Sequence, residues 1–125
     1  MSVEMLLADG APPAVGPYSH ATLTKESAYI SGCLALDAEG TFLGGDAAAQ
    51  AKQALSNLSK VLAAANLAPS DVAKTVVFLT DMADFAAVNA VYAEFFGDHK
   101  PARSCIAVAA LPLGATVEIE AIAAR

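Results

Sequence analysis

The side chains that could do chemistry gather near the C-terminal end of the sequence. Arg103 and Cys105 stand two residues apart in "PARSCIAVAA", and Glu118 and Glu120 stand two residues apart in "ATVEIEAIA". A guanidinium offers a planar fork that matches a carboxylate, and a glutamate can hold or deprotonate a water molecule. Both segments are typical of strands, in which residues two apart share a face. Each pair is therefore expected on a single face of its strand.

The last two strands are predicted over residues 103–110 and 115–124, joined at the "LPLG" turn. If they pair as a hairpin with their β-branched faces toward the helices, these four side chains fall on one common face, away from the helices. The rest of that face is alanine and isoleucine, so it carries less charge than an ordinary solvated sheet. We expect a subunit interface that contains a polar pocket. The alternative is a cross-strand salt bridge on a solvent-exposed sheet, which contributes under ~1 kcal/mol.

Hydrophobic periodicity predicts the elements that position these residues. A helix begins after Asp46, with apolar residues every three or four positions, and ends near Asn66. A second helix is capped by Asp81 or Asp84 and ends at Gly97. Strands are predicted at residues 3–7, as a pair within 21–37, and at 76–80, the last central in its sheet and buried on both faces. The element order predicts an α+β fold and a single domain over residues 1–125.

Composition excludes several classes of function. The net charge is −6 and the basic residues are scattered, so neither a nucleic acid nor a membrane surface is expected as a partner. Two cysteines do not make a disulfide scaffold, and the spacing of cysteines and histidines matches no metal motif. The chain is 56% hydrophobic and only 16% charged, which favours an oligomer. A cytoplasmic protein with reduced thiols is expected, because no secretory or membrane-spanning segment is present in the sequence.

Four motifs together resemble the RidA/YjgF family of reactive-intermediate deaminases. They are "GPYSHA", "SGCLALD", "VVFLTDMADFAAVNAVYAEFF" and "PARSCIAVAALPLGATVEIEAIA", which span nearly the whole chain. The resemblance implies a chorismate-mutase-like fold, with a curved, mainly antiparallel sheet and two helices on one face. It also implies a homotrimer with a central barrel and sites between subunits. The implied activity is hydrolysis of 2-imino acids and their enamine tautomers, released by pyridoxal-phosphate enzymes, to 2-keto acids and ammonia, with no cofactor or metal.

The resemblance also implies a role for each motif residue. Arg103 is expected to bind the substrate carboxylate, Glu118 to position the attacking water, and Cys105 to line the pocket without forming a covalent bond. A glutamate beside an arginine keeps a low pKa, so Glu118 is expected to orient water rather than to act as a strong base. Glu120 is expected to support the same face. The remaining implied substrate-binding residues, some of them from a neighbouring chain, are Tyr18, Ser31, Gly32 and Asn89.

The sequence departs from the family pattern at four positions and leaves two other functions open. His20 and Cys33 stand where the family usually has glutamine, and Ala110 and Leu113 replace basic residues. The first alternative function is a trimeric module that binds a 2-keto acid without turning it over. The second is the ribonuclease activity for which some relatives are named, and the acidic charge and the lack of a histidine pair argue against it.

Overall fold

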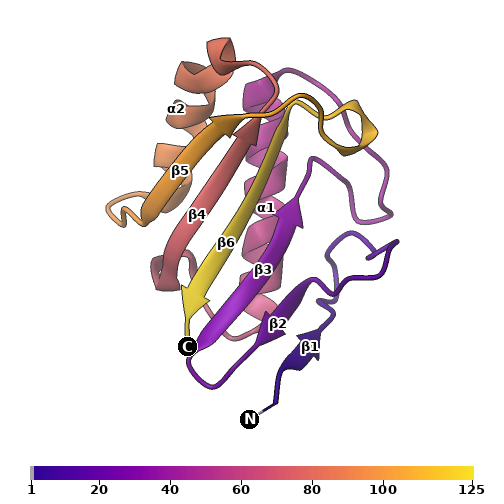
Figure 1. Cartoon of the computed structure of the whole chain (residues 1–125), viewed down its shortest axis with the longest axis vertical. Helices are drawn as coiled ribbons and strands as arrows, with labels where there is room; N and C mark the ends of the chain where they lie inside the picture. The colour runs from indigo at the N-terminus through magenta and orange to yellow at the C-terminus, as the bar shows by residue number, and fades with distance from the viewer. Residues whose placement is uncertain (1) are drawn as a thin grey trace.

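The computed structural model describes residues 2–125, which form a six-stranded sheet and two helices (Figure 1). The strands are β1 (Glu4–Leu6), β2 (Ala21–Leu23), β3 (Ser27–Cys33), β4 (Val72–Leu79), β5 (Ala102–Ala107) and β6 (Val117–Ala124). The helices are α1 (Ala47–Ala64) and α2 (Phe85–Phe96). Short 3-10 turns at residues 69–71, 82–84 and 112–114 lead into β4, α2 and β6. The predicted α+β class is confirmed.

The strand order in the sheet is β1-β2-β3-β6-β4-β5. Neighbouring strands are antiparallel except β4 and β5, which are parallel. The hairpin expected between the last two strands is therefore wrong, because β5 and β6 flank β4 on either side. A parallel pair needs a long crossover connection, and α2 supplies it between β4 and β5.

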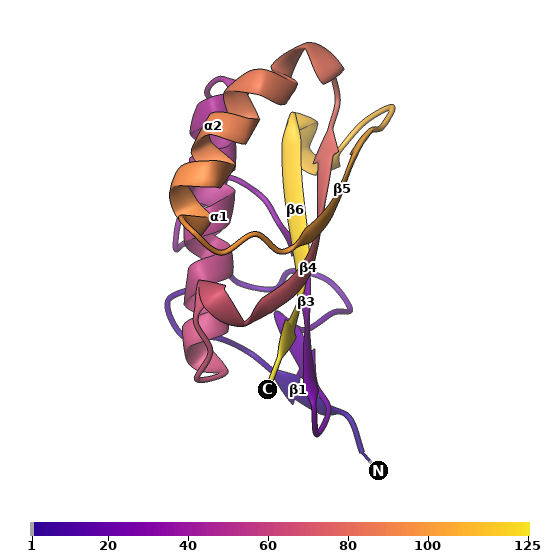
Figure 2. The same ribbon diagram turned by 90° about the vertical axis from the view of Figure 1, so that its left-hand side faces the viewer.

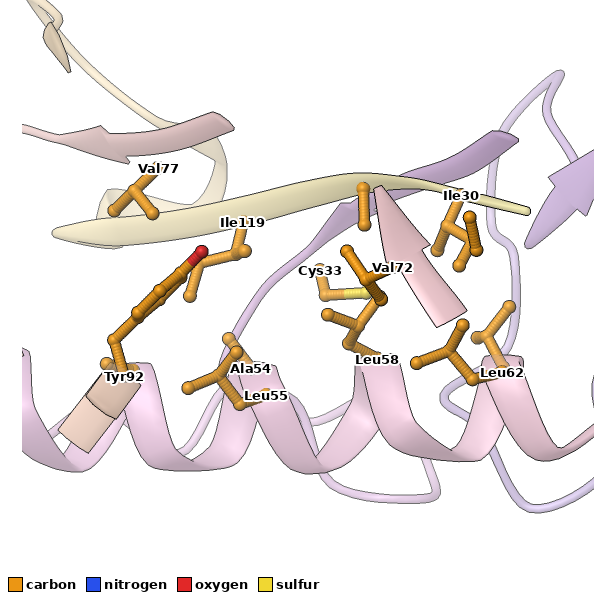
Figure 3. Packing of buried hydrophobic residues seen from close by; sticks show 14 of the residues in the cluster. Ile30, Cys33, Ala54, Leu55, Leu58, Leu62, Val72, Val77, Tyr92 and Ile119 are labelled. Carbon is orange, nitrogen blue, oxygen red and sulfur yellow. The ribbon is translucent and has the colours of Figure 1, made fainter. Parts of the chain in front are cut away.

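Both helices cover the same face of the sheet, as Figure 2 shows from the side. Leu55, Leu58 and Leu62 of α1 are fully buried in the core with Val77 of β4 and Ile119 of β6 (Figure 3). Burying a leucine side chain contributes roughly 1.5–3 kcal/mol, so this layer is the main source of stability. Within the part of the chain described here, neither helix has the length and apolarity that crossing a membrane requires.

Polar caps set where the helices begin, and they do so where the sequence predicts. The Asp46 side chain accepts a hydrogen bond from the Ala49 N–H at 2.8 Å, which satisfies one free donor at the start of α1. Before α2, the Asp81 side chain caps the 3-10 turn by accepting a hydrogen bond from the Ala83 N–H at 2.9 Å. Asp84 stands at the N-cap position of α2, but its side chain makes no capping hydrogen bond. Gly97 ends α2 with φ at 62°, a conformation that glycine adopts without strain.

The sheet face opposite the helices remains open and partly apolar. Tyr29, Ile106 and Ile122 are 45%, 45% and 37% exposed on it. Strand β4 lies inside the sheet as predicted, but only its helix-facing side chains are fully buried. Val76 and Phe78, on the open face, are half-buried, so the expectation of burial on both faces is wrong for the single chain.

Candidate functional site

The strand register places the arginine and the glutamates on opposite faces of the sheet. Arg103 of β5 lies beside Thr75 of β4, which is fully buried under the helices. Glu118 and Glu120 of β6 lie beside Phe78 and Val76, on the open face. Since residues in register share a face, the common face expected for these charges is wrong within one chain. The error lies in the assumption that the β-branched face of β5 meets the helices. Ile106 instead lies beside Phe78 on the open face and is 45% exposed, so Arg103 and Cys105 face the helices.

Arg103 lies in a group of residues that we call the arginine cluster. One of its guanidinium N–H groups, on Nη1, donates a hydrogen bond to Oδ1 of Asn89 at 2.6 Å. Its Cζ lies 4.8 Å from the ring centroid of Tyr92 and 5.6 Å from that of Phe85. Cys105 follows on the same face of β5 and is half-buried. A hollow beside the cluster is lined by Asn89, Tyr92, Phe96, His99, Lys100 and Arg103, among others.

The second group, which we call the glutamate cluster, consists of Tyr18, Ser31, Gly32 and Glu118. The first three line a hollow beside the loop that precedes β2. The Ser31 hydroxyl donates to the Ser19 carbonyl at 2.7 Å, which fixes β3 to that loop. The Glu118 carboxyl group lies directly against Gly32: a Cβ added to this glycine would stand 2.8 Å from Cδ of Glu118 and closer still to Oε2. Only glycine permits this approach.

Burial raises the pKa of Glu118 above its usual range, and the nearby Glu120 carboxylate raises it further. The low pKa expected for this residue is therefore wrong within the chain, because Arg103 lies on the other face and does not stabilise the charge. A carboxylate with a raised pKa is a better proton acceptor than an ordinary surface glutamate.

The two cysteines are in environments that disfavour the thiolate. Burial raises the pKa of Cys105, and the Arg103 charge offsets this only in part. Burial also raises the pKa of Cys33 to about 12, in the core beneath β3 (Figure 3). Thiolates are the nucleophilic form, so neither residue is set up for covalent catalysis. No three His, Cys, Asp or Glu side chains of residues 2–125 are grouped as a metal ion would require.

Two contributors to the site were missed in the sequence. Phe85 and Tyr92 flank Arg103, and their spacing from Asn89 puts all three on one side of α2. The spacing is visible in the sequence, but which strand lies under this helix is not. His20, which the sequence already marks as a departure from the family pattern, is hydrogen bonded to the backbone at Ala8 and Pro12.

Comparisons with known proteins agree with this structure over nearly its whole length. The family model described as endoribonuclease L-PSP matches residues 9–125. The 2-iminobutanoate/2-iminopropanoate deaminase of goat (Capra hircus) is 48% identical over 116 residues, which is 92% of this chain and 85% of the relative. The crystal structure of the yeast protein YEO7 matches with a TM-score of 0.96 at 41% identity and covers 99% of both chains.

A further solved structure carries a small ligand. The Escherichia coli protein TdcF, crystallised with bound serine, matches with a TM-score of 0.92 at 37% identity and covers 98% of both chains. Together with the family match, these similarities are far above what a shared fold alone produces. The chain therefore belongs to the endoribonuclease L-PSP family, which is the RidA/YjgF family that its motifs resemble.

Proposed function

We propose that this protein is a 2-iminobutanoate/2-iminopropanoate deaminase, which hydrolyses reactive imino acids to 2-keto acids and ammonia. The observation that carries the proposal is the pairing of two kinds of group. Arg103 is held by an amide oxygen and two aromatic rings, which leave its positive charge unneutralised. Glu118 is a half-buried carboxylate that lies against Gly32. A carboxylate-bearing substrate that reacts with water needs both. The 48% identity to a protein named for this activity supports the same conclusion.

The two clusters must meet for this chemistry, and we propose that they meet between subunits of a homotrimer. The arginine cluster lies on the helix side at the β5 edge of the sheet, and Glu118 lies on the open side of β6, against Gly32 of β3. A second copy packed against the partly apolar open face could bring its own β5 edge to the first copy's Glu118. In this arrangement Arg103 and Asn89 come from one subunit, and Tyr18, Ser31, Gly32 and Glu118 come from its neighbour.

The reaction then needs little more than orientation. Arg103 binds the substrate carboxylate, which places the imine carbon next to the water held by Glu118. The substrate reacts as its protonated iminium form: the water oxygen bonds to the iminium carbon, the C=N π pair moves to nitrogen, and Glu118 accepts one water proton, which gives a neutral tetrahedral carbinolamine. Glu118 returns that proton to the nitrogen. The C–N bond then breaks with its electron pair on nitrogen, the hydroxyl proton passes to Glu118 as the carbonyl forms, and ammonia leaves. Cys105 lines the pocket as a neutral thiol and takes no covalent part.

Release of ammonia from freshly generated 2-iminobutanoate tests the proposal. The wild-type protein is expected to accelerate ammonia release well above the uncatalysed rate. Arg103→Ala and Glu118→Gln are each expected to lose about 10²-fold or more in kcat/KM, because one removes the carboxylate partner and the other the proton acceptor. Lys25→Ala, which changes an exposed residue of the turn between β2 and β3 that belongs to neither cluster, is the charge-removal control and is expected to keep full activity. Equal rates for wild type and Arg103→Ala would refute the proposal.

The same assay separates the alternatives. The relative with bound serine is compatible with a module that only binds a small amino or keto acid, and such a module would bind 2-oxobutanoate without accelerating ammonia release. The ribonuclease named in the family description would need to attract a polyanion. The net charge of −6 opposes that attraction, so RNA cleavage by the pure protein is not expected.

A further inference from the structure

One side of α2 forms a cradle around the Arg103 guanidinium. Phe85, Asn89 and Tyr92 are four and three residues apart, which stacks them on the same side of the helix. Asn89 accepts a hydrogen bond from Nη1 at 2.6 Å, while the two rings present their π systems at 4.8 Å and 5.6 Å from Cζ. Arg103 itself is exposed, so without this cradle a long flexible side chain on an edge strand would have many rotamers.

Tyr92 is the best anchored member of the cradle. Its ring is 8% exposed and packs against Phe96, with the ring centroids 4.8 Å apart. Its hydroxyl oxygen lies 2.7 Å from Oγ1 of Thr75, a fully buried residue of β4. Figure 3 shows the Tyr92 hydroxyl turned from α2 toward the sheet. Because Thr75 lies beside Arg103 in the strand register, one hydrogen bond ties the ring to the strand next to the arginine.

The chemistry of the cradle suits an arginine that must bind an anion. A glutamate or aspartate partner would hold the guanidinium, but it would also occupy its fork and cancel its charge. An aromatic face attracts the cation without using any N–H donor. Burial raises the pKa of Tyr92, so its hydroxyl stays neutral and adds no competing charge. The cradle therefore restricts the guanidinium and leaves most of its donors available.

We propose that Tyr92, anchored by Thr75, is a positioning residue that holds Arg103 in the orientation that binds the substrate carboxylate. This inference rests on the proposed function, since it assumes that Arg103 binds that carboxylate. Tyr92 itself has no role in proton transfer. Its effect is expected in substrate affinity, which depends on how well the guanidinium is pre-oriented, and not in the turnover of bound substrate.

Calorimetric titration with 2-oxobutanoate, together with imine hydrolysis, tests the inference. Tyr92→Leu removes the π face and is expected to weaken 2-oxobutanoate binding by about tenfold and to raise KM by a similar factor, with kcat nearly unchanged. Tyr92→Phe keeps a ring and loses the bond to Thr75, so its loss of affinity is expected to be smaller than that of Tyr92→Leu. Val88→Ala is the matched control, because Val88 lies on the same helix, is 2% exposed and takes no part in the cradle.

Val88→Ala is expected to lower the melting temperature by a comparable amount while it leaves the affinity within about twofold of wild type. The inference is overturned if Tyr92→Leu binds 2-oxobutanoate as tightly as wild type, or if Val88→Ala weakens binding as much as Tyr92→Leu does. Arg103→Ala distinguishes this failure from failure of the proposed function. If Arg103→Ala also binds 2-oxobutanoate and hydrolyses the imine as wild type does, the proposed function is wrong. If Arg103→Ala loses binding while Tyr92→Leu does not, only the positioning role of Tyr92 is wrong.

Discussion

At the scale of single residues, the surroundings of Glu118 decide what its carboxylate can do. Gly32 has no side chain, so the carboxylate can lie against the backbone of β3 and become half-buried. Burial and the neighbouring Glu120 both make its ionised form less favourable. The ionised form is nevertheless the one that accepts a proton from water. Within the chain, Glu118 therefore carries an energetic cost that a purely structural residue would not need.

This cost gives a stability prediction with a definite sign. The pKa of Glu118 is raised above its ordinary value of 4.5 in the folded chain. Between pH 4.5 and the raised pKa, the folded state therefore binds more protons than the unfolded state. Its destabilising effect is absent well below pH 4.5, grows as the pH rises, and is complete above the raised pKa. Glu118→Gln is therefore expected to raise the melting temperature at pH 7 and to leave it nearly unchanged at pH 3.5.

The comparison is best made in an Arg103→Ala background, so that no arginine from a neighbouring subunit stabilises the carboxylate. The double variant and Arg103→Ala alone are melted at both pH values by calorimetry. The raised pKa of Glu118 would be contradicted if the two variants differed in melting temperature by the same amount at both pH values, or if the double variant melted at the lower temperature at pH 7.

The sequence assigns an expected role to single residues without naming their partners. Arg103 and Glu118 are expected to be the working pair from their residue types and motif, yet the hydrogen bond to Asn89 and the two aromatic rings around the arginine are not predicted. The apolar stripe of α2 fits either Val91 or Tyr92, since both follow Val88 at helical spacing. Only the packing against β4 selects Tyr92, through its bond to Thr75.

At the scale of elements, His20 holds the segment before β2 in place. The Ala8 N–H donates to its Nδ1 at 2.7 Å, so the ring proton is on Nε2, which donates to the Pro12 carbonyl at 2.7 Å. Pro12 and His20 line the same hollow as Tyr18. A glutamine, which the family usually has at this position, also offers one acceptor and one donor. The departure from the family pattern therefore leaves the hydrogen bonding of this segment intact.

Two substitutions at His20 test whether its two hydrogen bonds stabilise this segment. His20→Leu leaves the buried Ala8 N–H and the Pro12 carbonyl without partners and is expected to cost roughly 1–3 kcal/mol of stability. His20→Gln is expected to stay within about 1 kcal/mol of wild type, because it can make both bonds. Chemical denaturation measures the stability, and hydrogen exchange at the Ala8 amide reports the bond directly. Similar exchange rates in the two variants would show that His20 does not hold this segment.

The elements themselves are more predictable than their pairing. Both helices and their capping aspartates follow from periodicity and from the preference of aspartate for helix starts, which are local properties. Which strands lie side by side depends on contacts between residues far apart in the sequence. Alternation defines the two faces of β5, but it cannot say that β4 and not β6 is its neighbour. Nor can it say which face of β5 meets the helices, and choosing the β-branched face for that role put Arg103 on the wrong side.

At the scale of the whole molecule, a single chain keeps Arg103 and Glu118 on opposite faces of its sheet and leaves one of these faces uncovered. The open face carries exposed Tyr29, Ile106 and Ile122 next to the half-buried Glu118. A monomer would place this apolar surface in water, whereas an assembly would cover it and could join the two clusters. In the proposed trimer, assembly and catalysis are one requirement, because the subunit that covers the open face also brings the arginine.

Mixed assemblies of two inactive variants test this requirement directly. We assume that Arg103 and Glu118 of one site come from different subunits, and Arg103→Ala and Glu118→Gln chains are co-expressed in equal amounts. A site is then intact when a Glu118→Gln chain supplies its arginine and an Arg103→Ala chain supplies its glutamate. Random association in a closed ring places about a quarter of the sites in this arrangement, so about a quarter of wild-type imine hydrolysis is expected. Each variant purified alone should stay inactive, and light scattering should give the mass of a trimer for all three samples. A trimer of mixed chains with no recovered activity would mean that each site takes both residues from one chain, which the opposite faces of the sheet make hard to achieve.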